Sequence, residues 1–170
     1  MILYFRFLFR MLLALRKPKI PAGSKTSLKM RVWLRDCASK NCNNSRFYSF
    51  MDIAQHENNM RTGFIQLAMK KGWSAVYRSA RITFYKPMPR LSKFEVTAQV
   101  VTFDDKFFYW RNEFINSKGE LAAVGYSRVS IRVRKERKAV DPREVISGLD
   151  PNWTPAVPAS DITPLLDDVH

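Results

Sequence analysis

The segment from residue 31 to residue 52 restricts the fold more than any other part of the chain, because three patterns follow one another in it. It begins as a strand, breaks into a short polar turn and continues as an amphipathic helix. Apolar residues of the helix recur with spacings of three and four, at Phe47, Phe50, Met51 and Ala54. The N-cap comes from Asn43, Asn44 or Ser45. A helix placed between strands predicts that a sheet packs against it.

Downstream of this helix the sequence alternates between apolar and polar residues, which is typical of strands. Four such runs are expected, at Ser79–Tyr85, Phe94–Phe103, Phe107–Ile115 and Leu121–Val133. Asp104–Lys106 and Asn116–Gly119 are the turns between the last three runs. Short connections favour antiparallel neighbours, so we expect an α+β fold in which a long antiparallel sheet wraps one central helix.

The remaining segments divide the 170 residues into three parts. Residues 1–29 are an apolar, basic arm followed by a linker, residues 30–138 form the folded domain, and residues 139–170 form a C-terminal segment. Within the domain, a second short helix from Thr62 to Lys71 is closed by Gly72. In the C-terminal segment, Asp141-Pro142 opens a short helix that ends near Gly148, and the proline-rich remainder is expected to be an extended tail.

Positive charge is concentrated in the N-terminal arm. The net charge is +14, and residues 1–35 contain nine Lys or Arg residues and no acid. Arg6 and Arg10 share one helical face and leave an apolar face opposite. The apolar run is too short and too charged for a membrane-spanning helix. It is typical of a mitochondrial targeting segment or of an anchor on a membrane surface through residues 1–16.

A second basic group lies at the end of the last strand. Its members are Arg128, Arg132, Arg134, Lys135, Arg137 and Lys138. Such a group can contact phosphate or an anionic surface. It can equally be a solvated outer face of the strand, and strand periodicity alone explains it.

Cysteine and histidine are too few for a common metal site. The chain has Cys37 and Cys42, and its two histidines are His56 and His170. Tetrahedral metal sites need about four such ligands, so no metal is predicted. No other cofactor is expected either. We expect the two cysteines to remain thiols in a reducing compartment, rather than to form a bridge with each other.

The segment RVWLRDCASKNCNNSRFYSFMDIAQ resembles the signature of the 4-hydroxybenzoyl-CoA thioesterase-like superfamily, which has the hotdog fold. Within it the chain is most similar to the thioesterase-superfamily member 6 group. This group has a similar basic apolar N-terminus, a Met-Asp pair in the helix, a hairpin like FDDKFFYW and a proline-rich tail. The resemblance covers about residues 30–158. It implies pairing into a homodimer, or into a pseudo-dimer with a related protein.

Residues of the catalytic turn depart from the family pattern. The resemblance implies a carboxylate in this turn and carbonyl polarisation by amides at the helix N-terminus. Asp36 matches the first Asp, but Ala38 stands where the second, reactive Asp is expected, and Asn41 stands where the family has His. The turn is also one residue shorter. The sequence therefore predicts a degenerate catalytic turn.

The candidate catalytic groups are Asp36, Asn41, Asp52 and Glu57. Asp36 either acts as a base or caps the turn. Asp52 matches a position with a structural role in the family, whereas Glu57 is expected to face solvent, and His56 is expected to be an exposed or core-edge residue. The residues that match best are Asn43, Asn44, Ser45 and Arg46, and they are expected to cap the helix and fix the turn.

Three functions follow from these observations. The favoured one is a structural or assembly subunit of a large mitochondrial complex in the matrix or on the inner membrane, with ribosomal RNA or other subunits as partners. The second is an acyl-CoA thioesterase that hydrolyses a fatty acyl-CoA. The third is binding of acyl-CoA or acyl-carrier protein without hydrolysis.

Overall fold

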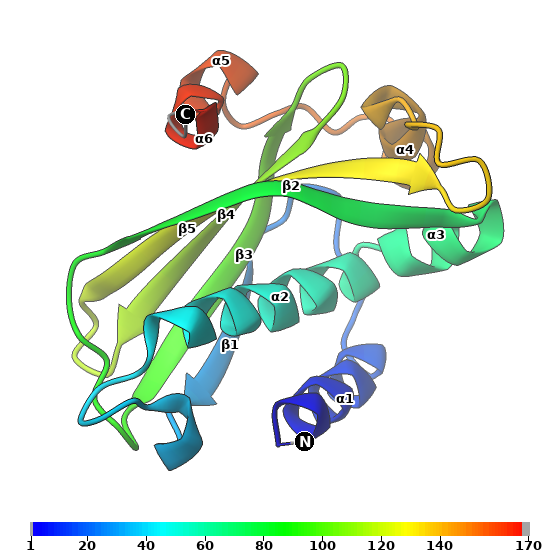
Figure 1. The fold of residues 1–170 in the computed structure, drawn as a ribbon. Coiled ribbons are helices and arrows are strands. Elements are labelled where there is room, and N and C mark those ends of the chain that lie inside the picture. The colour runs from blue at the N-terminus through cyan, green and yellow to red at the C-terminus, as the bar shows by residue number, and fades with distance from the viewer. Residues whose placement is uncertain (1, 168–170) are drawn as a thin grey trace.

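The computed structural model describes residues 2–167 as one long antiparallel sheet with a central helix against it (Figure 1). The strands, in the order in which they lie side by side, are β1 (Thr26–Arg31), β3 (Lys93–Phe103), β4 (Phe108–Asn116), β5 (Leu121–Val133) and β2 (Trp73–Phe84). All four pairings are antiparallel. The expected α+β architecture, a sheet wrapped around one helix, is confirmed.

The central helix α2 (Asn44–Arg61) forms where the sequence predicts it. Asn43 is the N-cap, and its side chain accepts a hydrogen bond from the Ser45 N–H at 2.9 Å. The helix turns its apolar side chains toward the sheet, where Phe50 packs on Phe94 with ring centres 4.9 Å apart. The apolar residues that it buries are Phe47, Phe50, Met51, Ile53 and Ala54. This contact makes helix and sheet share one core.

Two short helices also follow their sequence signals. α3 (Phe64–Lys71) ends at Gly72, which has the positive φ of 67° that glycine adopts without steric cost. α4 (Pro142–Leu149) begins with Asp141 as N-cap, whose side chain accepts the Arg143 N–H at 2.8 Å. Both helices lie near the same end of the sheet (Figure 1).

The first strand lies earlier than expected. β1 occupies Thr26–Arg31 and so begins inside the segment predicted to be a linker, which was expected to end at residue 29; residues 34–36 form a 3-10 turn in place of a strand. Within β1, Thr26, Leu28 and Met30 alternate as buried residues with exposed ones. Leu28 and Met30 alternate with Ser27, Lys29 and Arg31 as strand residues do, but the Lys, Pro and Gly residues just before them favoured a linker.

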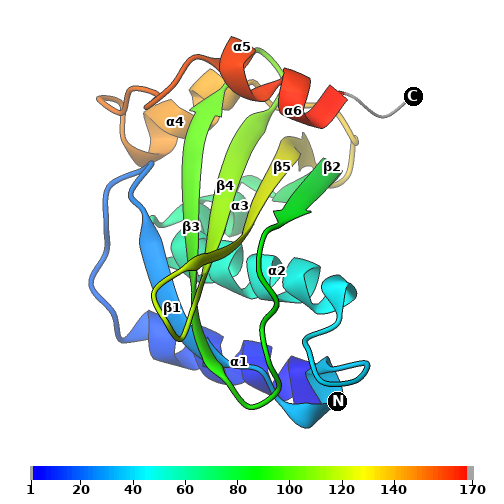
Figure 2. The ribbon, with the colours of Figure 1, turned by 90° about the vertical axis from the view of Figure 1, so that its left-hand side faces the viewer.

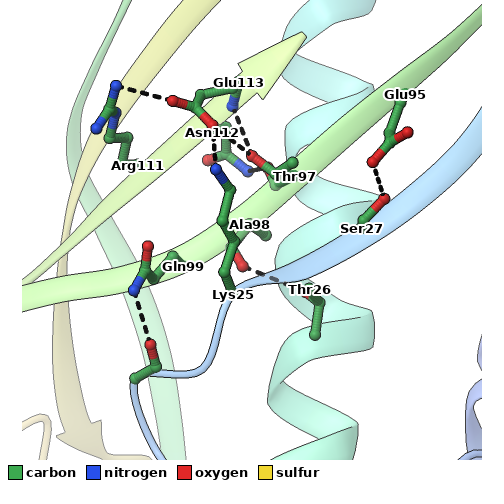
Figure 3. Close-up of polar contacts among 11 residues, drawn as sticks. Lys25, Thr26, Ser27, Glu95, Thr97, Ala98, Gln99, Arg111, Asn112 and Glu113 are labelled. Carbon is green, nitrogen blue, oxygen red and sulfur yellow. Dashed lines mark hydrogen bonds and ion pairs between the residues drawn. The ribbon is translucent and has the colours of Figure 1, made fainter. Parts of the chain in front are cut away.

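Hydrogen bonds and ion pairs fasten β1 and the segment before it to β3 and β4 (Figure 3). The Lys25 ammonium binds the Glu113 carboxylate, which also pairs with Arg111 at 2.8 Å. Gln99 donates to the Gly23 carbonyl at 2.9 Å. Burial alone would raise the pKa of Glu113, but the hydrogen bond from Lys25 and the charge of Arg111 outweigh it and hold that pKa below its ordinary value.

The C-terminal segment is not the extended tail that the sequence predicts. Two short helices, α5 (Ala159–Ile162) and α6 (Pro164–Asp167), cross the outer face of the sheet (Figure 2). Ile162 and Leu166 bury themselves there against Val101 and Tyr109. The outer face carries apolar residues that need cover, and the tail supplies it.

The arm begins with α1 (Ile2–Leu15), which packs on the side of α2 that faces away from the sheet (Figure 1). The Phe7 ring meets the His56 ring edge-to-face with centroids 5.0 Å apart, and Ala14 is only 3% exposed. The side chains of Arg6 and Arg10 lie outside the described part of the structure. Among the residues described, none of the helices has the length and apolar character needed to cross a membrane.

Candidate functional site

Asp36 is committed to the local structure of the turn. It is 4% exposed, and its Oδ2 accepts the Trp33 N–H at 2.9 Å. Its own carbonyl accepts the Asn43 N–H at 2.8 Å, which ties the turn to the start of α2. A carboxylate engaged in this way closes the 3-10 turn and has little access to a substrate.

The rest of the turn forms an open depression lined by Ala38, Ser39, Lys40, Asn41, Cys42, Asn43 and Asn44. Its lining residues include no carboxylate and no imidazole. Asn41 is exposed and lies opposite Pro89 in an isolated bridge. Arg46 donates to the Arg35 carbonyl at 3.3 Å, across the turn. Asn44 and Ser45 are exposed in the first turn of α2.

Asp52 borders a different groove, between α2 and the edge strand β2. The groove has a volume of about 510 Å³ and is lined by Tyr48, Ser49, Met51, Asp52, Tyr77, Arg78, Ser79 and Ala80. The Asp52 side chain is 50% exposed, and its Oδ1 lies 3.2 Å from the Tyr77 hydroxyl and 3.5 Å from His56 Nδ1. Asp52 is therefore the candidate carboxylate that a substrate in this groove can reach.

Tyr77 stays protonated at neutral pH. The residue as a whole is 45% exposed, but partial desolvation where the hydroxyl meets Gln55 raises the pKa of that hydroxyl, and the negative charge of Asp52 raises it further. The hydroxyl lies 2.5 Å from Gln55 Oε1, so it positions Gln55 as well as contacting Asp52. His56 lies at the edge of this group, with Nδ1 2.9 Å from the Asp52 carbonyl.

Sequence reasoning missed the polar network beneath this groove. Gln55 is buried and donates to Asn112 Oδ1 at 2.7 Å and to Ser127 Oγ at 3.1 Å. Asn112 in turn donates to the Thr97 carbonyl at 2.8 Å. The strand alternation could have indicated this network. It places Asn112 on the same face of its strand as Trp110, and Ser127 on the same face as Val129, so both polar side chains point inward.

Glu57 does not face solvent, and that prediction is wrong. Its side chain is 1% exposed, because α1 and the segment after it cover this side of α2. Lys17 Nζ lies 2.5 Å from Glu57 Oε1, while Glu57 Oε2 has no hydrogen-bond partner in the described structure. The pair joins the arm to the helix and lies outside both the turn depression and the groove at Asp52.

The basic residues of the last strand do not form one continuous surface. Arg128 is half-buried, 5.0 Å from the Phe107 ring centre, and Ser130 is buried between it and the rest. Arg134 donates to the Trp73 carbonyl at 3.0 Å. The exposed members gather around the turn after β5 and are Arg132, Arg134, Lys135, Arg137 and Lys138. An anionic partner can reach this group at that turn.

No cluster of three or more metal-ligating side chains occurs in the described part of the chain. Comparison with curated proteins by sequence gives no significant match. Several solved structures share the fold. Their sequence identities to this chain are low, so the likeness is evidence for the fold only.

Three of these solved structures illustrate the match. A Lactobacillus plantarum protein assigned provisionally as an oleoyl thioesterase has a TM-score of 0.70 at 13% identity, over 80% of this chain and 54% of its own. This chain therefore spans about half of that protein. The DHNA-CoA thioesterase of Staphylococcus aureus has a TM-score of 0.65 at 16% identity, over 83% of this chain and 92% of its own. The S. aureus protein SAV2348, solved in complex with CoA, has a TM-score of 0.64 at 12% identity, over 83% of this chain and 94% of its own.

A family model for the thioesterase-like superfamily matches residues 32–148, which is more than half of the chain. The matched segment contains the turn, α2 and the four strands that follow it. The chain belongs to the thioesterase-like superfamily.

Proposed function

We propose that this chain is a hotdog scaffold that has lost the chemistry of its turn and works as a structural or assembly subunit in mitochondria. The observation that carries the proposal is the state of Asp36, whose carboxylate is buried and bound to the Trp33 N–H. Ala38 and Asn41, which follow in the same turn, cannot act as a base at neutral pH. The acid-free arm supports mitochondrial targeting.

The first experiment measures hydrolysis of acyl-CoA by the purified full-length chain over a panel of acyl chain lengths. The wild type is expected to release CoA no faster than the Asp36→Asn variant at every chain length. If the wild type hydrolyses an acyl-CoA and Asp36→Asn does not, the proposal that the turn has lost its chemistry is wrong.

The second experiment tests the assembly. Mitochondrial extracts are sedimented at low and at high salt, and the chain is located by immunoblotting. Co-sedimentation with ribosomal RNA that weakens steeply as salt rises indicates phosphate contacts by the basic residues around Arg134. Co-sedimentation that persists at high salt indicates protein contacts within an inner-membrane complex. A free small oligomer in the matrix would contradict the assembly role.

A second candidate function, acyl-CoA hydrolysis, is favoured by the groove at Asp52. There the Asp52 carboxylate would take a proton from water as the water oxygen bonds to the thioester carbonyl carbon. The C–S bond would then break, and Asp52 would return the proton to the departing CoA thiolate, leaving the free acid and the CoA thiol. The carbonyl oxygen would need donors, and the free amides of a helix N-terminus are suitable. Asp52 lies eight residues beyond Asn44, about 12 Å along the axis at 1.5 Å per residue. Within one chain the two groups are therefore too far apart to share one carbonyl.

A second copy could bring its own helix N-terminus to Asp52, so this mechanism requires the dimer. The test compares wild type with Asp52→Asn and, as a matched control, Asp161→Asn, which removes an exposed carboxylate on α5. Hydrolysis by wild type and Asp161→Asn with a loss of at least about a hundredfold in Asp52→Asn would establish this function. Equal rates in all three proteins would exclude it.

A further inference from the structure

α1 has an outward face that the domain leaves uncovered. Its inner face packs on α2 through Phe7 and Ala14. On the outer face Leu8, Phe9, Leu12 and Leu15 are 46%, 60%, 56% and 64% exposed. Positions 8, 12 and 15 follow one another at spacings of four and three, so these side chains form one apolar stripe along the helix. An exposed apolar stripe of this kind indicates a contact surface.

The apolar surface continues beyond α1 onto the 3-10 turn. Trp33 and Leu34 are 49% and 60% exposed. Phe9 and Trp33 line a common groove of about 700 Å³, together with Lys29, Arg31 and Lys93. α1 lies on the side of the molecule opposite α5 and α6 in both views (Figures 1 and 2). One side of the protein thus combines exposed apolar side chains with lysine and arginine.

The charge around this surface matches an anionic bilayer. Residues 1–35 contain no acid, and Glu95 is the one carboxylate that lines the groove, where Ser27 donates to it. α1 has 14 residues, which span about 21 Å and cannot cross a hydrocarbon core of about 30 Å. Helices of this kind lie flat at the boundary of headgroups and acyl chains, and tryptophan favours the same depth.

We propose that the outer stripe of α1, together with Trp33 and Leu34, docks this protein on a membrane surface that contains anionic phospholipid, while the inner face stays on α2. The surface is separate from the turn and from the groove at Asp52, and the proposal requires that the arm stays on the protein after targeting. An RNA partner would leave the stripe in water, since phosphates contact only the basic side chains. A bilayer accommodates the apolar stripe and the basic rim together.

The test is flotation of the full-length chain with vesicles of phosphatidylcholine alone or mixed with phosphatidylserine. We expect the protein to float with the mixed vesicles, and added salt to reduce but not abolish the binding. A Leu12→Ser, Leu15→Ser double variant should lose at least about tenfold in partition coefficient. Arg35 is exposed next to Leu34, and Lys93 lines the groove. The Arg35→Gln, Lys93→Gln double variant should lose about tenfold on mixed vesicles and keep its partition into pure phosphatidylcholine.

The matched control is Met69→Ser, which removes an apolar side chain that is 70% exposed on α3. It should float like the wild type. The leucine variants should keep the wild-type melting temperature, because both side chains point away from α2. Three results would overturn the proposal: no flotation, an equal loss with Met69→Ser, or a mature protein that lacks residues 1–20 in cells.

Discussion

At the scale of single residues, the Lys17–Glu57 pair joins the N-terminal arm to the central helix. Glu57 is 1% exposed at its side chain, and Lys17 is the partner of its Oε1. Charges in such places are stable only with a counter-ion, because desolvation is costly. The pair therefore makes the position of α2 depend on the arm, which lies 40 residues earlier in the chain.

Substitution of Lys17 tests this dependence. Lys17→Gln should lower the free energy of unfolding by on the order of 2 kcal/mol, because it leaves a buried carboxylate unpaired. Glu57→Gln should cost less, and the double variant should recover much of the loss. Urea unfolding of all four proteins measures the coupling. Additive effects of the two substitutions would show that the pair contributes nothing.

The sequence alone predicted the positions of some residues of the site. Asp36 and Asn43 lie where a helix cap and a turn predict them, because both obey local rules. The position of Glu57 was predicted wrongly, because its burial depends on α1, and helix periodicity carries no information about a distant arm. Tyr77 and Gln55 were missed for the same reason, since they meet across two elements.

At the scale of elements, the two cysteines flank the altered turn. Cys37 and Cys42 face each other in an antiparallel bridge, and both are reduced. The hydrogen bond next to this bridge runs from the Asn43 N–H to the Asp36 carbonyl, and the Cys42 N–H donates to the Met88 carbonyl. The two cysteines therefore do not bond to each other through their backbones and form a non-hydrogen-bonded pair. Such pairs have Cα atoms about 4.5 Å apart, within the disulfide range of about 4.4–6.8 Å.

Oxidation of the folded protein should therefore close an intramolecular disulfide. Burial, with the charge of Asp36 added, raises the pKa of the Cys37 thiol. The rate should accordingly rise as the pH is raised above neutral, because the thiolate is the reacting form. Mass spectrometry of unreduced peptides after diamide treatment detects the bond. Cys37→Ser is the control, and a product cross-linked between chains would contradict the geometry.

The sheet carries an acid-sensitive contact at Glu113. Its pKa is lowered in the folded protein, so its contribution to stability is complete above the unfolded value of about 4.3 and is lost as the pH falls through the folded value. Glu113→Gln should cost about 1 kcal/mol at neutral pH. The difference from wild type should shrink below about pH 4. Urea unfolding at several pH values measures it, and a constant difference would contradict this account.

Elements with strong local signals were predicted well. The range of β5 is the predicted one, and α3 ends at Gly72 as expected. β1 was placed too late, because the Lys, Pro and Gly residues before it were taken to continue as a linker through Lys29. The helices α5 and α6 were missed because each has only four residues, and they are held by burial of Ile162 and Leu166 on the sheet. These are tertiary contacts, and local helix propensity carries no information about them.

At the scale of the whole molecule, β2 is an edge strand of the sheet, paired with β5 on one side and with no strand on the other (Figure 2). It is 12 residues long, and Val76, Tyr77, Phe84 and the adjoining Tyr85 are 41%, 45%, 41% and 58% exposed. Long apolar edges of this kind pair with another strand. A second copy joined at β2 would continue the sheet and place its helix near Asp52.

We therefore expect a homodimer in solution, joined through β2. Val76→Lys should convert it to a monomer, because it places a charge in the apolar edge. Sedimentation equilibrium measures the mass, and Leu121→Lys on β5, at a residue 38% exposed, is the control. A wild-type monomer at high concentration would exclude this interface.

The order of synthesis gives the docking of α1 on α2 a further consequence. α1 leaves the ribosome before its partner helix exists. Lys17 meets Glu57 only after 40 more residues have been made, and the separation between Phe7 and His56 is larger still. During this interval both faces of α1 are open, and the nascent chain presents more apolar surface than the finished protein does. Any surface that captures α1 then competes with the folding of the domain, so the order of these two events decides where the protein folds.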